Sequence, residues 1–344
     1  MPYVRTTLIL LAAALAAPGA DFRLGIIGTD TSHVPAFTKI LNGEGTGMRV
    51  VAAYKGGSKD IEESSRRVDQ FAEDIRSQFG VEIVPDIRTL LSKVDGVLLS
   101  SVDGRIHLEQ ARPVIAAHKP LFIDKPLAAT LEDAREIARL AKEAGVAWFS
   151  SSSLRFGAIG SSMKFSDTTG AETWGPGPFE PHHYLDLAWY AVHPIETLYT
   201  IMGPGCQTVT RISGADAEVV IGRWKYGRIG TVRAIRPYSD YGAVVYRPKE
   251  VVESHPKSGP ATDYRPLVTE IVKFFQTGNP PVPNSETLEI FAFMEEPPRP
   301  VWARQRVPDS PEPVPGDSIR VPAAPPRRAG PVPVGRAATP GRRW

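Results

Sequence analysis

Short apolar runs alternate with longer segments of mixed polarity through the first half of this chain. The runs, each short enough for a buried strand, cover residues 22–28, 49–53, 81–84, 96–100 and 121–123. Residues 35–42 and 60–80, which lie between them, are predicted to form helices. Strands that alternate with helices predict a parallel sheet with helices on both of its faces.

The clearest helix is predicted over residues 130–145. Thr130 has a side chain typical of an N-cap, and Gly145 suits the C-cap. The apolar stripe between them consists of Ala134, Ile137, Ala138 and Ala141. In the helix before it, Pro113 predicts a kink or a late start, because proline cannot donate a helical hydrogen bond.

The second half of the chain has a different pattern. Residues 217–221, 228–235 and 241–246 are rich in β-branched and aromatic side chains and are separated by turns that contain glycine. This pattern predicts an antiparallel sheet. Residues 264–277 and 285–295 are then predicted to be helices. The expected fold is α/β, with a doubly wound parallel sheet followed by an α+β domain.

The first 20 residues have the composition of a signal peptide. Arg5 precedes an apolar run at residues 8–17, and small side chains follow where signal peptidase would cut. The run is too short to span a bilayer, so no stable membrane insertion is expected. The protein is therefore predicted to be periplasmic or secreted, or cytoplasmic if the start codon is misassigned.

Residues 297–344 contain 13 prolines and nine arginines but no lysine. Such a composition cannot bury enough apolar surface to offset chain entropy, which predicts a disordered tail. Two origins stay open, namely a shifted reading frame in a GC-rich gene and a Pro-rich interaction tail.

Composition excludes several classes of function. The net charge is only +2, and no basic stripe is interleaved with aromatic residues, so nucleic-acid binding is not expected. Cys206 is the only cysteine, which excludes an intrachain disulfide and a cysteine-based zinc site. His183 and Asp186 are three residues apart, but they complete no recognisable ligand set, and no metal is expected.

The strongest chemical candidate is Asp124-Lys125-Pro126, directly after a predicted strand. Ligands of open α/β sheets bind at the carboxyl edge, and proline restricts the preceding lysine to extended geometry. A lysine held at such an edge can lose proton affinity through burial and then serve in proton transfer. A solvated lysine in a turn is the alternative.

Three segments carry a resemblance to a known family. They are the run Ser-Ser-Val-Asp-Gly-Arg-Ile-His at residues 100–107, the Asp-Lys-Pro motif and Leu154-Arg155-Phe156. In this order they resemble the Gfo/Idh/MocA family of glucose–fructose oxidoreductases and inositol dehydrogenases, whose hallmark is Glu-Lys-Pro. The resemblance spans roughly residues 22–296. It implies a Rossmann-type domain over residues 21–148, a substrate and oligomerisation domain with an open, mostly antiparallel sheet over residues 149–296, and a homo-oligomer.

The family binds NAD or NADP through a glycine-rich loop after the first strand, which is altered here. Only Gly28 remains of the three glycines, while Asp30 and His33 replace the others. The loop would bind phosphate through backbone amides and hydroxyls, or else the pocket has lost the cofactor. Asp30 could instead be a helix N-cap, and His33 could pack or reach the site. The cofactor-binding residues that the resemblance implies are Gly28, Thr29, Asp30, Thr31, Ser32, Ser101, Asp103, Asp124 and Lys125.

The end of the second strand favours NADP over NAD. NAD specificity usually comes from an acidic residue there, but residues 54–59 contain none. Lys55, Ser58 and Lys59 could hold a 2′-phosphate. A solvated basic turn is the alternative.

Residues 181–203 match the helix that carries the family's D-x-G-x-H-x-x-D motif. His193 aligns with the histidine, and Glu196 with the trailing acid, which would orient the imidazole from three residues away. Trp189 replaces the leading acid. The resemblance implies catalysis by Lys125 and His193. It implies substrate contacts from Arg155, Trp189, Tyr190 and Glu196.

The expected function is hydride transfer between nicotinamide and a sugar, cyclitol or related polyol. Two alternatives remain open. One is a glycosidase that oxidises its substrate transiently with tightly bound NAD. The other is a family member without activity that acts as a sensor or scaffold, which the altered glycine loop would explain.

Overall fold

The computed structural model describes residues 21–43, 45–254 and 263–295. The predicted signal peptide and Pro/Arg-rich tail lie outside these residues. In the described part of the chain, no helix is both long enough and apolar enough to cross a membrane.

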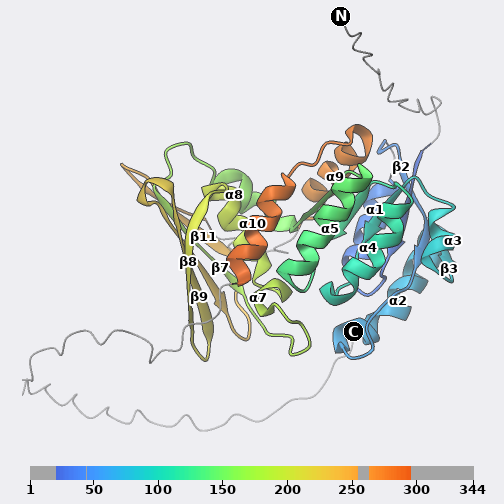
Figure 1. Cartoon of the computed structure of the whole chain (residues 1–344), viewed down its shortest axis with the longest axis horizontal. Coiled ribbons are helices and arrows are strands. Elements are labelled where there is room, and N and C mark those ends of the chain that lie inside the picture. Colours follow the sequence, from blue (N-terminus) through green and yellow to red (C-terminus); the bar gives the residue numbers. More distant parts are fainter. Residues whose placement is uncertain (1–20, 44, 255–262, 296–344) are drawn as a thin grey trace, which may run out of the picture. The chain divides into compact units, whose positions relative to one another are not determined.

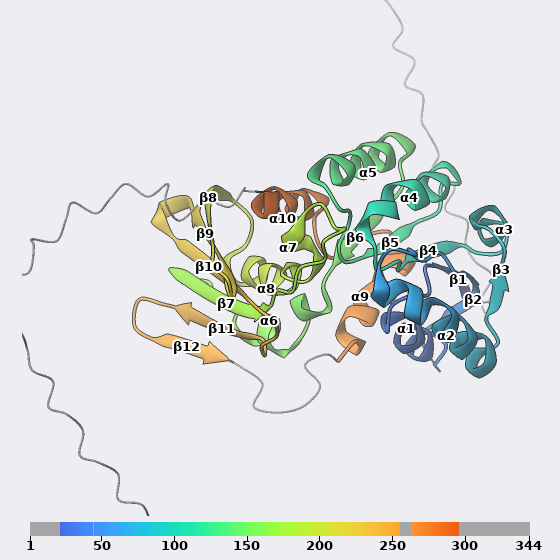
Figure 2. The same ribbon diagram turned by 90° about the horizontal axis from the view of Figure 1, so that it is seen from below.

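The first sheet lies among the blue and teal elements of Figure 1. It is a six-stranded parallel sheet with the order β3-β2-β1-β4-β5-β6, whose strands are labelled in Figure 2. Its strands are β1 (Phe22–Ile27), β2 (Met48–Tyr54), β3 (Glu82–Val84), β4 (Gly96–Leu99), β5 (Leu121–Asp124) and β6 (Trp148–Ser151). Because β1 pairs with both β2 and β4, the chain changes direction across the sheet at β1. This is the switch point at which doubly wound sheets bind ligands.

Helices cover both faces of the first sheet, as Figure 2 shows. One face carries α1 (His33–Leu41), α2 (Glu62–Phe79) and α9 (Arg265–Thr277). The other carries α3 (Ile87–Leu91), α4 (His107–Ala116) and α5 (Leu131–Ala144). Although α9 follows the second sheet in sequence, it packs on the first, because its apolar stripe meets Phe122 and Phe149.

The predicted capping of α5 is confirmed. The Thr130 hydroxyl accepts a hydrogen bond from Asp133 N at 3.0 Å, and Gly145 ends the helix with a φ of 66°. Pro113, in contrast, lies inside α4, which begins six residues earlier at His107. The predicted late helix start is therefore wrong.

The second sheet is mixed and mostly antiparallel, with the order β12-β11-β7-β10-β9-β8. Its strands are β7 (Gly170–Pro176), β8 (Cys206–Ser213), β9 (Ala217–Trp224), β10 (Ile229–Ile235), β11 (Gly242–Tyr246) and β12 (Val251–Ser254). Only β7 and β10 pair in parallel. Buried residues alternate with more exposed ones along β9 and β10, so one face joins the core and the other stays open.

The helix α8 (Val192–Met202) is buried along most of its length against the second sheet. Next to it, α10 (Asn284–Glu295) packs against both α8 and α5. The remaining short helices are α6 (Ala158–Ser162) and α7 (Asp186–Trp189), with 3₁₀ turns at Gly104–Ile106, Ser153–Arg155 and Lys225–Gly227. This packing brings α8 to the carboxyl ends of the first sheet's strands.

Candidate active site

A cavity of about 220 Å³ lies where the loops after β1, β4, β5 and β6 meet α8. Lys125 and His193 both line it, although 68 residues separate them. The helix α2 contributes Glu63 and Arg67, and the loop before α1 contributes Thr31 and Ser32. The two predicted catalytic residues therefore share one polar cavity.

Lys125 follows β5 and extends into this cavity. Its ammonium nitrogen lies 3.5 Å from the Trp189 carbonyl oxygen and 5.1 Å from the centre of the Tyr190 ring. Burial lowers the pKa of Lys125, and the charge of Asp124 only partly opposes this effect. Lys125 is thus held at the cavity with a weakened hold on its proton.

Asp124 is buried, with 2% of its surface exposed. One carboxylate oxygen accepts the backbone N–H of Lys125 at 2.8 Å, and the other lies 2.5 Å from His33 Nδ1. Both oxygens are therefore occupied by protein partners. Because each carboxylate oxygen can accept two hydrogen bonds, these contacts leave room for the predicted role of Asp124 in cofactor binding.

His193 is fixed by Ser152, whose hydroxyl lies 2.7 Å from the imidazole Nδ1. The rings of Tyr190 and Tyr241 meet the imidazole edge-on, at 5.3 and 5.9 Å between centres. Burial holds the pKa of His193 well below its usual value, and the charge of Lys125 acts in the same direction. His193 therefore stays neutral in this structure.

Glu196 does not orient His193, which corrects the prediction from their spacing. Its carboxylate instead lies 2.5 Å from Nε of Arg155, and Arg155 also reaches Glu286 at 2.7 Å. All three side chains are at least nine-tenths buried. Arg155 and Glu286 lie on the wall of a different cavity of about 700 Å³. Glu196 pairs with Arg155 and not with His193 because a buried guanidinium needs carboxylate partners.

Of the other two predicted substrate residues, only Tyr190 lines the cavity. Trp189 is 6% exposed, and its indole packs 5.7 Å from the His183 ring. It reaches Lys125 only through its backbone carbonyl. Trp189 therefore has a packing role in this arrangement.

The turn after β1 requires glycine at residue 28. Gly28 has a φ of 87°, and a Cβ atom there would lie 2.3 Å from Ser101 N. The next residue, Thr29, is buried and donates its hydroxyl to Val68 O at 2.8 Å. The Ser32 side chain does not cap α1, but the Thr31 hydroxyl accepts the His33 N–H at 3.4 Å and the Thr31 carbonyl accepts the Val34 N–H at 3.1 Å. Thr31 and Ser32 both line the cavity.

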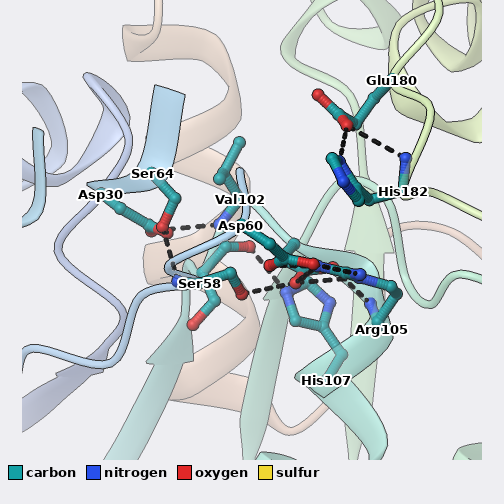
Figure 3. A network of polar contacts seen from close by, with 11 residues as sticks. Asp30, Ser58, Asp60, Ser64, Val102, Arg105, His107, Glu180 and His182 are labelled. Atoms are coloured by element: carbon teal, nitrogen blue, oxygen red, sulfur yellow. Dashed lines mark hydrogen bonds and ion pairs between the residues drawn. The ribbon is translucent and has the colours of Figure 1, made fainter. Parts of the chain in front are cut away.

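Asp30 is not the N-cap of α1, a position that Ser32 takes. Its buried carboxylate accepts hydrogen bonds from the Ser64 hydroxyl at 2.6 Å and from Val102 N at 3.1 Å (Figure 3). Burial raises the pKa of Asp30, and these hydrogen bonds oppose the rise. Asp30 thus joins the loops after β1 and β4 to α2.

The segment after β2, residues 55–61, closes onto the loop after β4 (Figure 3). The Ser58 hydroxyl bonds to the Asp103 carboxylate, and Arg105 joins Asp103 to Asp60. We call these contacts the polar latch. Ser58 is therefore not free to hold a 2′-phosphate, and Lys55 pairs with Asp69 at 2.8 Å. Ser101 is also engaged, since its hydroxyl donates to Gln110 at 2.8 Å.

The histidines and acid of residues 182–186 have separate partners. His182 is exposed and lies 2.7 Å from Glu180, whereas His183 is buried and bonds to Leu185 O. Asp186 pairs with Arg211 at 2.5 Å. Among the residues that the structure describes, no three His, Cys, Asp or Glu side chains form a group that could hold a metal.

Sequence reasoning missed several residues of the cavity wall and its support. Ser152, which positions His193, comes directly after β6, so its place at a strand's carboxyl end was a usable signal. Tyr241 and Tyr264 come from the second sheet's loops and from the start of α9. No local pattern places them here, because their approach depends on how distant elements pack.

Comparisons with known proteins agree with this fold. Residues 22–151 match the sequence model of an oxidoreductase family with an NAD-binding Rossmann fold. A 1,5-anhydro-D-fructose reductase of Ensifer adhaerens is 31% identical over 145 residues, which are 41% of this chain and 39% of that protein. The match thus spans about two fifths of the reductase's length.

Two solved structures are similar in fold. A probable dehydrogenase from Thermotoga maritima has a TM-score of 0.65 and 18% identity, and the match covers 79% of this chain and 94% of that one. The WlbA dehydrogenase from Bordetella pertussis, solved with NADH and UDP-GlcNAcA, has a TM-score of 0.62 and 17% identity. That match covers 80% of this chain and 94% of the other.

Proposed function

Residues 22–151 match the sequence model of the Gfo/Idh/MocA oxidoreductase family, and on this basis we propose that the chain is an NAD(P)-dependent dehydrogenase or reductase of a sugar, cyclitol or related polyol. The observation that carries the proposal is the shared cavity of Lys125 and His193 at the carboxyl edge of the first sheet. The names of the matched relatives support this substrate class, since they include a sugar reductase and a dehydrogenase solved with a nucleotide sugar.

The nicotinamide end of a dinucleotide fits the described residues. The positive dipole end of α1 begins at the cavity, and Thr31 and Ser32 offer hydroxyls there for a phosphate. The N–H groups of His33 and Val34 bond to Thr31 itself, so the hydroxyls and the helix dipole carry this contact. Lys125 lies across the same cavity. When bound, the cofactor supplies the hydride acceptor or donor.

The adenosine end fits only after the polar latch opens. The adenosine ribose normally binds at the end of the second strand. Here the segment after β2 lies close to the turn after β1, since a Cβ atom added at Gly56 would be 3.3 Å from Gly28 Cα. The whole cavity is about 220 Å³, below the roughly 300–1,000 Å³ of typical ligand pockets. Residues 55–61 must therefore move for a whole dinucleotide to bind.

The latch predicts how affinity responds to substitution. The double variant Ser58→Ala and Asp60→Ala removes the two side chains that the segment after β2 contributes to the latch. It should strengthen ADP-ribose binding about 10-fold, which corresponds to about 1.4 kcal/mol. Nicotinamide mononucleotide, which does not need the opened end, should bind as before. Calorimetry with both ligands measures this.

The matched control is Ser65→Ala, because Ser65 is exposed in the first turn of α2 and its hydroxyl donates to the nearby Glu62 O, outside the latch. It should leave both affinities unchanged. Equal ADP-ribose affinity in wild type and latch variant would contradict the role of the latch.

Within the cavity, each residue has a defined part in the proposed reaction. Lys125 binds the substrate oxygen and stabilises the negative charge that develops there as the carbinol is oxidised. His193 stays neutral because of its burial and lines the same cavity as Lys125. Tyr190 and Tyr241 keep water out around it.

We further propose that NADP is bound in preference to NAD. Lys55 and Lys59 are exposed after β2, and no carboxylate ends that strand. Lys59→Ala should then weaken NADP binding several-fold while leaving NAD binding unchanged, as calorimetry would measure. Tighter binding of NAD than of NADP to the wild-type protein would contradict this preference.

The enzymatic proposal is tested by following the absorbance of reduced cofactor with a panel of sugars, cyclitols and sugar acids. Substrate-dependent reduction of NAD or NADP is the expected result. Failure of the purified protein to bind any nicotinamide dinucleotide would overturn the proposal and leave a sensor or scaffold instead.

A further inference from the structure

We propose that His33, held by Asp124, is the acid–base residue of this cavity and exchanges the substrate's hydroxyl proton. The inference rests on the proposed function and deepens it. It starts from a position where the dinucleotide loop normally carries a small residue and this chain has an imidazole.

The position of the His33 ring is determined on three sides. Its Nδ1 lies 2.5 Å from the Asp124 carboxylate, and both side chains are at least nine-tenths buried. Phe37 stacks on the ring at 5.1 Å, and Tyr264 meets it edge-on at 4.7 Å. A carboxylate behind an imidazole fixes its tautomer and stabilises the imidazolium that forms when the ring takes a proton.

The second ring nitrogen of His33 is available to a substrate. His33 lies on the wall of the cavity, and among the described residues Nε2 makes no hydrogen bond. With Nδ1–H donated to Asp124, Nε2 carries a lone pair. The arrangement therefore presents a base to the cavity.

The hydrogen-bond network gives His193 the opposite role. The Ser152 hydroxyl accepts the N–H of Leu154 at 3.1 Å, and its one other partner in the described structure is His193 Nδ1 at 2.7 Å. The hydroxyl proton is thus donated to Nδ1, which leaves the hydrogen of the neutral ring on Nε2. His193 then donates to a substrate oxygen and does not accept its proton.

Five of the six other titratable or charged groups of the cavity are unsuited to act as the base. The titratable and charged side chains around it, besides His33 and His193, are Lys125, Glu63, Arg67, Tyr190, Tyr241 and Tyr264. Burial raises the pKa of Tyr190 and Tyr241, so both remain protonated. Glu63, in the first turn of α2, pairs with Arg67 at 3.5 Å, which stabilises its ionised form and weakens it as a base. Lys125, if it stabilises the oxygen as a cation, cannot also take the proton.

The step balances in atoms and electrons. A bound nicotinamide would supply the oxidant, taking the hydrogen of the carbinol C–H bond together with its electron pair. The O–H bond breaks, its proton passes to Nε2 of His33, and the oxygen forms the new C=O bond. The product is a carbonyl compound, with an imidazolium–carboxylate pair at His33 and Asp124.

The first test is His33→Ala. Turnover should fall by about 10²–10⁴-fold, the usual contribution of a general base. The variant removes a ring that borders the cavity, so added imidazole should restore part of the rate. With substituted imidazoles, the rescued rate should rise with the basicity of the imidazole, which a packing role would not produce.

The matched control is His182→Ala, since His182 also faces a carboxylate, Glu180, but is exposed outside the cavity. It should keep wild-type turnover and show no rescue. Undiminished turnover in His33→Ala overturns the inference and leaves the proposed function intact. A rescue that is independent of imidazole basicity also overturns it.

A second measurement does not need the loaded enzyme. In nitrogen-15 spectra of the wild-type protein, His33 should show Nδ1 protonated and Nε2 unprotonated, with a downfield proton on Nδ1 that disappears in Asp124→Asn. The reverse tautomer would overturn the inference. A wild-type protein with this tautomer but no activity on any polyol would instead fail the proposed function, and the inference with it.

Discussion

Lys125→Met is expected to reduce kcat/KM by about 10²–10³-fold while leaving the protein folded. Methionine keeps most of the apolar stem but removes the charge that stabilises the developing alkoxide. Burial lowers the pKa of Lys125, so holding its ammonium in the folded protein costs free energy at neutral pH. The variant should therefore unfold at the same temperature as wild type or higher, as calorimetry would measure.

Lys142→Met is the control for this substitution, because Lys142 is exposed in the last turn of α5 and does not line the cavity. It should change neither activity nor the unfolding temperature. If Lys125→Met kept full activity, the ammonium would not act on the substrate, and the role assigned to this cavity would be refuted.

Gly28→Ala is expected to lower the free energy of unfolding by about 2–5 kcal/mol. The left-handed backbone contributes about 1–2 kcal/mol for a residue with a Cβ. The added methyl would lie 2.3 Å from both Ser101 N and Ser101 Oγ, and such overpacking adds about 1–3 kcal/mol. Chemical denaturation measures the loss.

Gly145→Ala separates the two contributions. Gly145 has a φ of 66°, yet no atom lies within 4 Å of its added Cβ. This variant should lose only the conformational part, about 1–2 kcal/mol. Equal losses in the two variants would show that the close approach to Ser101 has no energetic weight.

The first sheet was largely predictable because its strands are continuous apolar runs bounded by helices. The second sheet was only half predictable. The strand β7 contains Gly170, Gly175 and Pro176, which are residues typical of turns. The strand β8 is mostly polar and half-exposed, so no apolar run marks it. Both become strands because neighbouring strands pair with them.

The candidate site also contains residues that the sequence predicted and residues that it did not. The Asp-Lys-Pro motif indicated Lys125 because its position after a strand is a local property. The partner of His33 was not predictable, because Asp124 lies 91 residues away in the sequence. Nothing in the sequence distinguishes Asp124 from the chain's other carboxylates as a partner. The spacing of His193 and Glu196 was misleading, because a shared helix face does not exclude a stronger partner such as Arg155.

The packing of α9 on the first sheet affects how the chain folds during synthesis and where it can be truncated. The helix contributes Leu267, Val268, Ile271, Phe274 and Phe275 to a core whose other buried members lie between residues 24 and 149. During synthesis that core stays unfinished until more than a hundred further residues have been made. A fragment that ends at residue 151 would lack α9 and would expose the hydrophobic surface formed by Phe122 and Phe149. We expect this fragment to aggregate.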